Sequence, residues 1–314
     1  MAFYTLKRVL VAIPVLLFVA LGTFALVYLM PGDSATAVAG EGADEKRIAE
    51  VREQLGLNDS FLDQFGRWVG GISQGDFGTS IVHHRPVLDI IVERVGVTLS
   101  IVVVGFILAA LIGIPAGIAA GIRAGSPLDR VITALTTAGI AIPAFWLGML
   151  LVIVFAISLG WFRATGYTSL FDDPLRWAQS MVLPGLAVAA ASAADVARQT
   201  RASVADAIAK DFTRTNIAMG FFRQSVVYRH ALRNAGIPIV AVLGVQIERL
   251  FSAAVVIEIV FAMPGIGTFL VNSAQSQDLP VIQGIVLMIA VAIITTNLLV
   301  DLTYSWINPR IRTQ

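Results

Sequence analysis

The sequence predicts an all-α integral membrane protein with six transmembrane helices and a small helical extracytoplasmic domain between the first and second. The chain of 314 residues is 57% hydrophobic and only 14% charged, which is more apolar surface than a soluble protein of this length can bury. Six apolar stretches are long enough to cross a bilayer, which takes about 20 helical residues. The absence of Cys excludes disulfides, thiolate metal sites and cysteine nucleophiles.

The first apolar stretch, residues 9–30, follows Lys7 and Arg8. A cleavable signal peptide is the competing interpretation, with the small residues 35–39 near a cleavage site. The apolar core of a signal peptide has about 7 to 15 residues, which is shorter than this stretch. We therefore expect residues 1–30 to form a cytoplasmic N-terminus and a retained first transmembrane helix.

Residues 31–96 form a polar segment with eleven acidic and six basic side chains. Apolar residues recur in it at helical spacing, and Ser60 with Asp63 has the pattern of a capping box. We therefore expect an extracytoplasmic helical domain.

Two motifs in this segment suggest chemistry. Residues 71–75 read Gly-x-Ser-x-Gly, but a nucleophile elbow needs a large sheet that a helical segment of this size does not supply. His83 and His84 could bind a metal, yet adjacent residues point apart and further ligands are missing. We interpret the first motif as a glycine-rich loop between helices and the second as surface.

The remaining residues, 97–314, are predicted to form a five-helix transmembrane core that includes a cytoplasmic loop at 204–235. The expected spans are 97–121, 131–160 with Pro143 in its middle, a fourth starting near Met181, 236–262 and 281–306, with a loop at 161–180. Gly113, Gly117 and Gly121 are spaced four residues apart, which allows two helices to approach closely in lipid. Pro115 lies among them and predicts a kink.

Basic residues predict the orientation. The N-terminus, 122–130, 198–234 and the C-terminal tail together hold thirteen Lys and Arg, whereas the opposite side holds eight, six of them in the long polar domain. Long domains are translocated largely regardless of charge. We therefore expect a multi-pass protein with both termini in the cytoplasm, which in a bacterium places it in the cytoplasmic (inner) membrane.

The basic connection between the fourth and fifth spans, Lys210 to Pro238, is predicted to start with a short helix. Asp211 is a candidate N-cap and Gly220 a candidate stop, while Phe212, Ile217 and Phe221 supply apolar anchors. A short helix outside the membrane is suited to docking.

This connection resembles the cytoplasmic EAA loop of ABC importer permeases of the dipeptide/oligopeptide/nickel family, in which a D-[YF]-[VT]-R-T run leads through Gly to R-H-A-L-R-N-A and Pro. Residues 211–215, Gly220, 229–235 and Pro238 fit, while Asn216, Ile217 and Met219 depart. Further blocks resemble the first permease subunit of that family, namely YTLKRVLVAIPVLLFV with MPGD, LGLNDSFLDQFGRWVGGISQGDFGTSI, PAFWLGMLL, IEIVFAMPGIG with LPVIQG, and NLLVDLTYSWINPRIR.

The resemblance implies a type I ABC importer permease for di- or oligopeptides, with nickel chelates, glutathione or haem as alternative substrates. The implied partners are a second homologous permease, two ATPase subunits that bind ATP and Mg, and an extracytoplasmic solute-binding protein. No cofactor of the chain itself and no nucleic acid are implied. Coupling to the ATPases would involve Asp211, Phe212, Thr213, Arg214, Thr215 and Gly220.

Polar side chains within the fifth span suggest a transport path. Gln246, Glu248 and Arg249 lie near its middle, where a charge costs about 2.5 to 3.5 kcal/mol. Glu248 could attract the amino group of a peptide and Arg249 its carboxylate, or each could pair with the second permease. Glu258 matches a family block near the outer end, where it either meets the exported domain or the binding protein, or makes a buried structural contact.

Enzymatic function is not expected. No glycine-rich loop is followed by Gly-Lys, and only three lysines exist, so a P-loop for ATP cannot form. A secondary transporter without ATPase partners is the alternative from another class, but such proteins often carry broken spans in an internal repeat, and no block of this sequence recurs.

Overall fold

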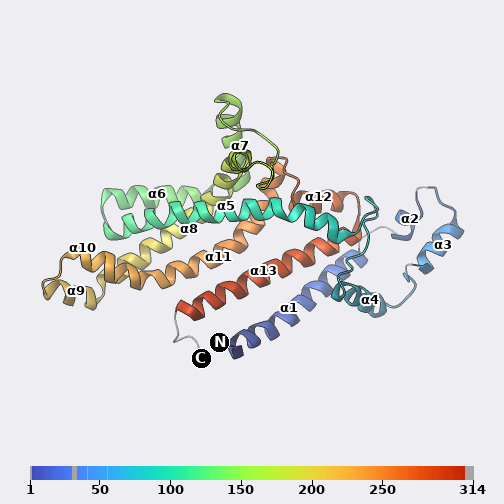
Figure 1. The fold of residues 1–314 in the computed structure, drawn as a ribbon, viewed down its shortest axis with the longest axis horizontal. Coiled ribbons are helices and arrows are strands. Elements are labelled where there is room, and N and C mark those ends of the chain that lie inside the picture. The colour runs from blue at the N-terminus through green and yellow to red at the C-terminus, as the bar shows by residue number, and fades with distance from the viewer. Residues whose placement is uncertain (1, 30–33, 41, 55, 308–314) are drawn as a thin grey trace. The chain divides into compact units, whose positions relative to one another are not determined.

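The computed structural model describes residues 2–29, 34–40, 42–54 and 56–307. Among these residues it contains helices and no strand (Figure 1). The helices are α1 (Ala2–Leu29), α2 (Ser34–Ala39), α3 (Glu45–Gln54), α4 (Phe61–Ser73), α5 (Val87–Ile122), α6 (Pro127–Ala141), α7 (Ala144–Leu151), the π-helical η1 (Val152–Ser158), α8 (Pro174–Ala209), α9 (Asp211–Ala218), α10 (Arg223–Ser225), the π-helical η2 (Val226–Ala231), α11 (Leu232–Val260), α12 (Ile266–Gln275) and α13 (Leu279–Ile307). The MPGD block and the last residues of the final block, 308–314, lie outside the described part.

The chain divides into two compact units. The first, called the core unit below, contains residues 97–267 and 296–307 of the described chain. The second, called the outer unit, contains the described residues of 2–96 together with 268–295. Helices α5, α12 and α13 contribute residues to both units.

The number of spanning helices is only partly determined. Helices α5, α8, α11 and α13 contain stretches long and apolar enough to cross a membrane, and a bent pair made of α6 with α7 and η1 passes the same test together. In α1 the apolar stretch Leu10–Leu26 is shorter. The described residues therefore hold four spans, or five with the bent pair, and the count of six stays a prediction.

The third predicted span is broken rather than straight. Its two halves, Pro127–Ala141 and Ala144–Ser158, are bent by 101° relative to each other. Ile142 is extended at φ −81° and ψ 121°, and Pro143 starts α7 as its N-cap. The residue before a proline avoids helical backbone, and proline lacks the N–H that a continuing helix needs, so the chain turns there.

The glycines of α5 lie against α8, as their spacing predicted. A Cβ at Gly113 would lie 2.6 Å from the carbonyl oxygen of Ala193, and one at Gly117 would lie 2.5 Å from that of Ala197. At Gly121 the equivalent distance, to the carbonyl of Arg201, is 2.8 Å. Only residues without a side chain permit this approach, so the two helices touch through their backbones.

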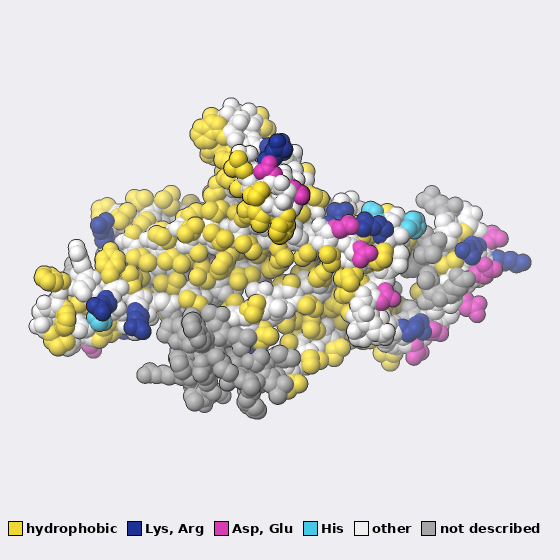
Figure 2. Space-filling model, viewed as in Figure 1, with side chains coloured by type: hydrophobic (Ala, Val, Ile, Leu, Met, Phe, Trp, Pro, Cys, Tyr) yellow, Lys and Arg dark blue, Asp and Glu magenta, His cyan; other side chains and the backbone are white. Residues whose placement is uncertain are grey.

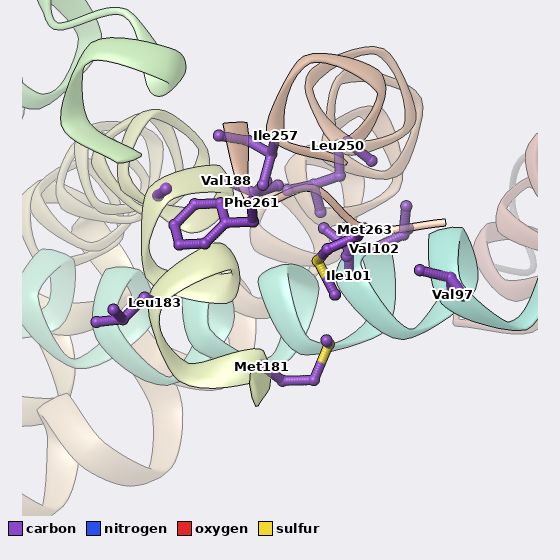
Figure 3. Close-up of a cluster of buried hydrophobic side chains, with 12 residues drawn as sticks. Val97, Ile101, Val102, Met181, Leu183, Val188, Leu250, Ile257, Phe261 and Met263 are labelled. Atoms are coloured by element: carbon purple, nitrogen blue, oxygen red, sulfur yellow. The ribbon is translucent and has the colours of Figure 1, made fainter. Parts of the chain in front are cut away.

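Helix α8 is the centre of the core unit. It starts at Pro174, inside the stretch predicted as a loop, because Asp173 caps it by accepting hydrogen bonds from the N–H groups of Leu175 (3.1 Å) and Arg176 (3.0 Å). Its small residues are largely buried, and its partners include α6, α7 and α11. Figure 3 shows the main apolar cluster, formed by Val97, Ile101, Val102, Met181, Leu183, Ala187, Val188, Leu250, Ala254, Ile257, Phe261 and Met263.

The surface of the core unit is mostly apolar. Figure 2 shows hydrophobic side chains over α5, α6 and α11, whereas dark blue Lys and Arg side chains lie at the end of the unit that holds α9. Large side chains such as Leu111 (66% exposed) and Leu135 (66%) face outward. A soluble protein does not expose such an apolar area, so lipid or other subunits must cover it.

The outer unit contains short helices, as predicted for residues 31–96. Ser60 caps α4 by accepting a hydrogen bond from the N–H of Asp63 (3.3 Å). The ring of Phe24 in α1 packs against Phe61, Phe65 and Trp68 of α4, with ring centroids 5.3 to 5.6 Å apart. This aromatic cluster attaches α4 to α1.

The Gly-x-Ser-x-Gly motif forms the C-terminal end of α4. Ser73 donates a hydrogen bond to the carbonyl of Gly70 (2.7 Å), and no strand precedes it among the described residues. The motif therefore lacks the geometry of a nucleophile elbow. The ring of His83 packs against Phe269, with centroids 5.5 Å apart.

A buried carboxylate joins two distant segments of the outer unit. Asp278, just before α13, is 1% exposed. It accepts hydrogen bonds from the hydroxyl of Ser80 (2.5 Å) and from the N–H groups of Ile81 (3.1 Å) and Val82 (3.3 Å). The loop before α5 is thereby attached to the start of α13.

Candidate functional site

The predicted docking helix exists as α9. Helix α8 ends at Ala209, and only Lys210 separates it from α9. Lys210, extended at φ −67° and ψ 151°, is the N-cap, so the assignment of Asp211 to that position was wrong by one residue. Asp211 instead occupies the first helical turn, where the N-terminal end of the helix dipole favours a carboxylate.

One side chain of the predicted coupling set attaches α9 to α8. Thr213 is 1% exposed and donates from Oγ1 to the carbonyl of Ala207 (2.9 Å). Phe212 is half-buried, whereas Arg214 and Thr215 are exposed. The helix therefore has a face fixed to its own chain and a face open to a partner.

Gly220 ends this segment as predicted. Its φ of 91° lies in the left-handed region that glycine tolerates best. The N–H of Gly220 reaches the carbonyl of Ile217 (3.0 Å), and the N–H of Phe221 reaches that of Asn216 (3.2 Å). This turn redirects the chain from α9 toward α10.

Exposed apolar side chains surround the turn. Met219 is 63% exposed, Phe221 53% and Phe222 86%. Together with Ile217 they form what we call the apolar turn (Ile217, Met219, Phe221, Phe222). It lies close in the sequence to the exposed Lys210 and Arg214, and a mixture of aromatic, Met and Arg side chains is suited to contact with another protein.

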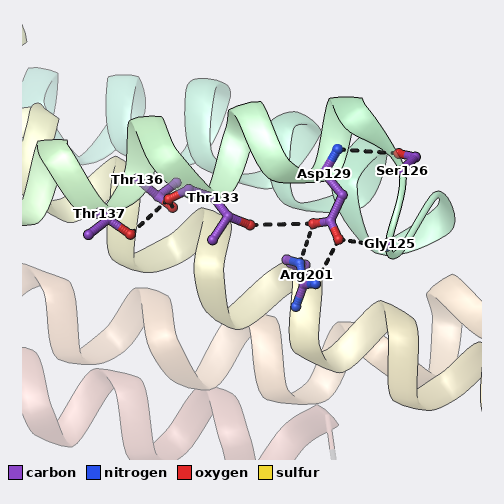
Figure 4. A network of polar contacts seen from close by, with 7 residues as sticks. All are labelled: Gly125, Ser126, Asp129, Thr133, Thr136, Thr137 and Arg201. Atoms are coloured by element: carbon purple, nitrogen blue, oxygen red, sulfur yellow. Dashed lines mark hydrogen bonds and ion pairs between the residues drawn. The ribbon is translucent and has the colours of Figure 1, made fainter.

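A buried ion pair supports the last turns of α8 (Figure 4). Asp129, whose side chain is 4% exposed, is in the first turn of α6 and contacts Nε and Nη2 of Arg201, the latter at 2.7 Å. The same carboxylate accepts from the N–H of Gly125 (2.8 Å). One side chain thus ties the connection between α5 and α6 to α8.

Replacing Asp129 by Ala is expected to lower the thermal denaturation temperature by a few degrees, because Gly125 loses its hydrogen-bond acceptor and Arg201, whose side chain is 36% exposed, loses an ion pair that solvent partly screens. Thermal denaturation of the purified protein measures the loss. Asp172 lies in the exposed connection before α8, so D172A is the control and should have little effect. A denaturation temperature of D129A equal to that of D172A would contradict the prediction.

A second charged cluster lies between α8 and α11. The carboxylate of Asp195, a residue that is 7% exposed, accepts from Arg249 (2.5 Å), Arg198 (2.5 Å) and the amide of Gln246 (3.1 Å). The two candidate path residues Gln246 and Arg249 therefore meet at Asp195. Glu248 is exposed and lies outside this cluster.

Sequence reasoning missed Asp195 and Arg198. Asp195 stands within an Ala-rich stretch that was interpreted only through its small residues. The signal was the acid itself, because a carboxylate within an apolar span requires a partner. That partner is on another helix, 54 residues later.

Glu258 is fully buried near the end of α11. Its carboxylate accepts from the hydroxyl of Thr98 (2.5 Å), which in turn accepts from the N–H of Ile266 (3.0 Å). A Cβ at Gly265 would overlap the carboxylate, so glycine is needed beside it. This is the geometry of a structural contact, one of the two roles considered for Glu258.

Comparison with known families decides what kind of protein carries these features. Residues 113–313 match the model of the binding-protein-dependent transport system inner membrane component. Residues 1–102 match the model of its N-terminal membrane component. The chain belongs to this family. It is thus a multi-pass inner-membrane permease of an ABC importer, a class that works with ATPase subunits and a binding protein, and the resemblance inferred from the sequence is confirmed.

Relatives with a name align with this permease over nearly their whole length. A putative peptide transport system permease protein of Brucella abortus (strain 2308) is 38% identical over 307 residues, which cover 98% of each chain. A glutathione transport system permease protein of Salmonella paratyphi A is 44% identical over 309 residues, again 98% of each.

Solved structures confirm the fold class. A chain of the MetNI methionine ABC transporter, in an inward-facing conformation, superposes with a TM-score of 0.57 at 16% identity. The match covers 70% of this permease and 96% of that chain. At this identity the likeness establishes an all-helical ABC permease fold and no more.

Proposed function

We propose that this permease forms half of the translocation path of an ATP-driven importer of short peptides, with a second homologous permease as the other half. Two ATPase subunits bind ATP and Mg, and an extracytoplasmic binding protein delivers the solute. The chain itself holds no cofactor and catalyses no reaction. Both termini and α9 lie in the cytoplasm, since the basic connections are on that side.

The direct passage from α8 into α9 carries the proposal. Helix α8 is buried at the centre of the core unit and continues to Ala209, and Thr213, four residues later, fixes α9 to it. A partner that binds α9 therefore holds the end of the central helix. Closure of the ATPase dimer would shift both, which opens or closes the path without chemistry by the permease.

The relatives narrow the substrate class. The Brucella abortus relative is named for peptide transport and the Salmonella paratyphi A relative for glutathione. We therefore assign short peptides as the substrate class. Glutathione is kept as the second candidate, because the relative named for glutathione transport has the higher identity of the two. Gln246, Glu248 and Arg249 are assigned to the path.

The apolar turn provides the test. Replacing Phe222 by Ser should weaken ATPase binding about 10-fold or more, because burying a Phe side chain contributes about 1.5–3 kcal/mol. ATPase retained by the purified permease pair and ATP-driven peptide uptake in proteoliposomes measure the effect. Phe171, 95% exposed in the connection before α8, gives the matched control F171S for ATPase retention. Unchanged ATPase binding and uptake in F222S would contradict the assignment.

A further inference from the structure

Two guanidinium groups in the core unit share one carboxylate. Arg198 contacts Asp195 through Nη2 and Arg249 contacts it through Nη1, each at 2.5 Å. Gln246, which is 1% exposed, donates to the same carboxylate from its buried side. Asp195 compensates one of the two positive charges, so this group of three ionic side chains keeps a net charge of +1.

Both arginines are exposed although they belong to apolar helices. The side chains of Arg198 and Arg249 are each 60% exposed, and Arg249 lies at the middle of the span Pro238–Val260. A charge at the middle of a span is costly in lipid and normally faces a water-filled cavity or another protein. The surface that presents the two guanidinium groups is therefore not one that lipid covers.

The cluster has unused capacity for an anion. A guanidinium carries five N–H donors, and each arginine uses one terminal nitrogen on Asp195. Arg pairs are suited to bind a carboxylate through parallel hydrogen bonds. Because Asp195 competes for the same donors, an incoming carboxylate is held weakly enough to leave, as a transport path requires.

We propose that Arg198 and Arg249, positioned by Asp195, form a binding site for the carboxylate group of the transported solute. This inference rests on the proposed function and adds a site with a stated ligand chemistry. A fixed contact with an acid of the second permease is less favoured, because Asp195 already occupies part of both guanidinium groups. The experiment below separates the two.

The absence of Cys makes the site accessible to a direct test. Val245 is 54% exposed and one helical turn from Arg249, so V245C places the only thiol of this chain beside the site. The complete importer is reconstituted, and the thiol is treated with methanethiosulfonates that carry either a sulfonate or a trimethylammonium group. The measured quantity is the ratio of the two reaction rates, which reports the local charge. Val256, 43% exposed and farther along α11, provides the control V256C.

Adding R249Q or R198Q to V245C should each lower the sulfonate-to-ammonium ratio about fivefold, because each removes one positive charge within several ångströms. D195N should raise the ratio, R249K should preserve it, and the ratio at V256C should not change. Dialanine at saturating concentration should slow the sulfonate reaction more than dialanine amide does.

Three results would overturn the proposal. A V245C thiol that reacts with neither reagent is covered by lipid or by the second permease. A ratio that does not respond to R249Q and R198Q shows that the arginines do not act there. Equal or absent slowing by dialanine and its amide shows that a carboxylate does not reach the site. ATP-driven peptide uptake by the importer with the unaltered chain is measured alongside. If this importer shows no uptake while the thiol reactions give the expected ratios, the proposed function is refuted and the anion site is not.

Discussion

Replacing Gly117 by Ala should lower the thermal denaturation temperature of the protein by several degrees. A Cβ at this position would lie 2.5 Å from the carbonyl oxygen of Ala197 and 2.5 Å from Cβ of Thr200. Neither neighbour is the end of a flexible side chain, so the helices must separate. Overpacking of this kind costs about 1–3 kcal/mol.

The direction of this effect is informative. At an exposed helix position, replacing Gly by Ala stabilises the helix by about 1 kcal/mol, so a loss of stability in G117A must come from the contact with α8. Gly96 is on the same helix, and apart from its chain neighbours and nearby helix backbone no atom of the described residues lies within 4 Å of a Cβ placed there. G96A should therefore leave the denaturation temperature unchanged or raise it slightly. If G117A were as stable as G96A, the close contact between α5 and α8 would not be the reason why position 117 needs glycine.

Replacing Asp278 by Ala should release the loop before α5. The substitution removes the acceptor of Ser80, Ile81 and Val82, and each buried donor left without a partner costs about 1–3 kcal/mol. Amide hydrogen exchange of Ile81 and Val82 should become about 10-fold faster or more.

The graded control is D278N, which keeps one acceptor oxygen at the same position. Its exchange rates should lie between those of the unaltered protein and D278A. Exchange at Ile81 and Val82 that stays slow in D278A would show that the loop is held by something other than this carboxylate.

The sequence allowed correct prediction of features that depend on local chemistry. The spacing of Gly113, Gly117 and Gly121 predicted a close helix contact, and Ser60 predicted the start of α4. Gly220 predicted the turn after α9, because a backbone with positive φ favours glycine. Each of these signals is contained within a few consecutive residues.

The features that were missed or misplaced depend on partners far along the chain or on small energy differences. Asp195 is paired with Arg249, and Asp129 with Arg201, 72 residues later. A single sequence does not show which helices face each other. The bend at Pro143 was predicted as part of one span, since a proline permits either a kink or a full break. The N-cap shifted from Asp211 to Lys210, within the usual uncertainty of a helix boundary.

The glycine contacts between α5 and α8 also limit how the permease moves. Three carbonyl oxygens of α8, at Ala193, Ala197 and Arg201, lie over three glycines of α5 at equal intervals. Sliding one helix along the other by less than a full turn would bring each carbonyl against a bulkier residue. We therefore expect that a partner which displaces α9 tilts the two helices together as one rigid lever, with its far end moving in the opposite direction.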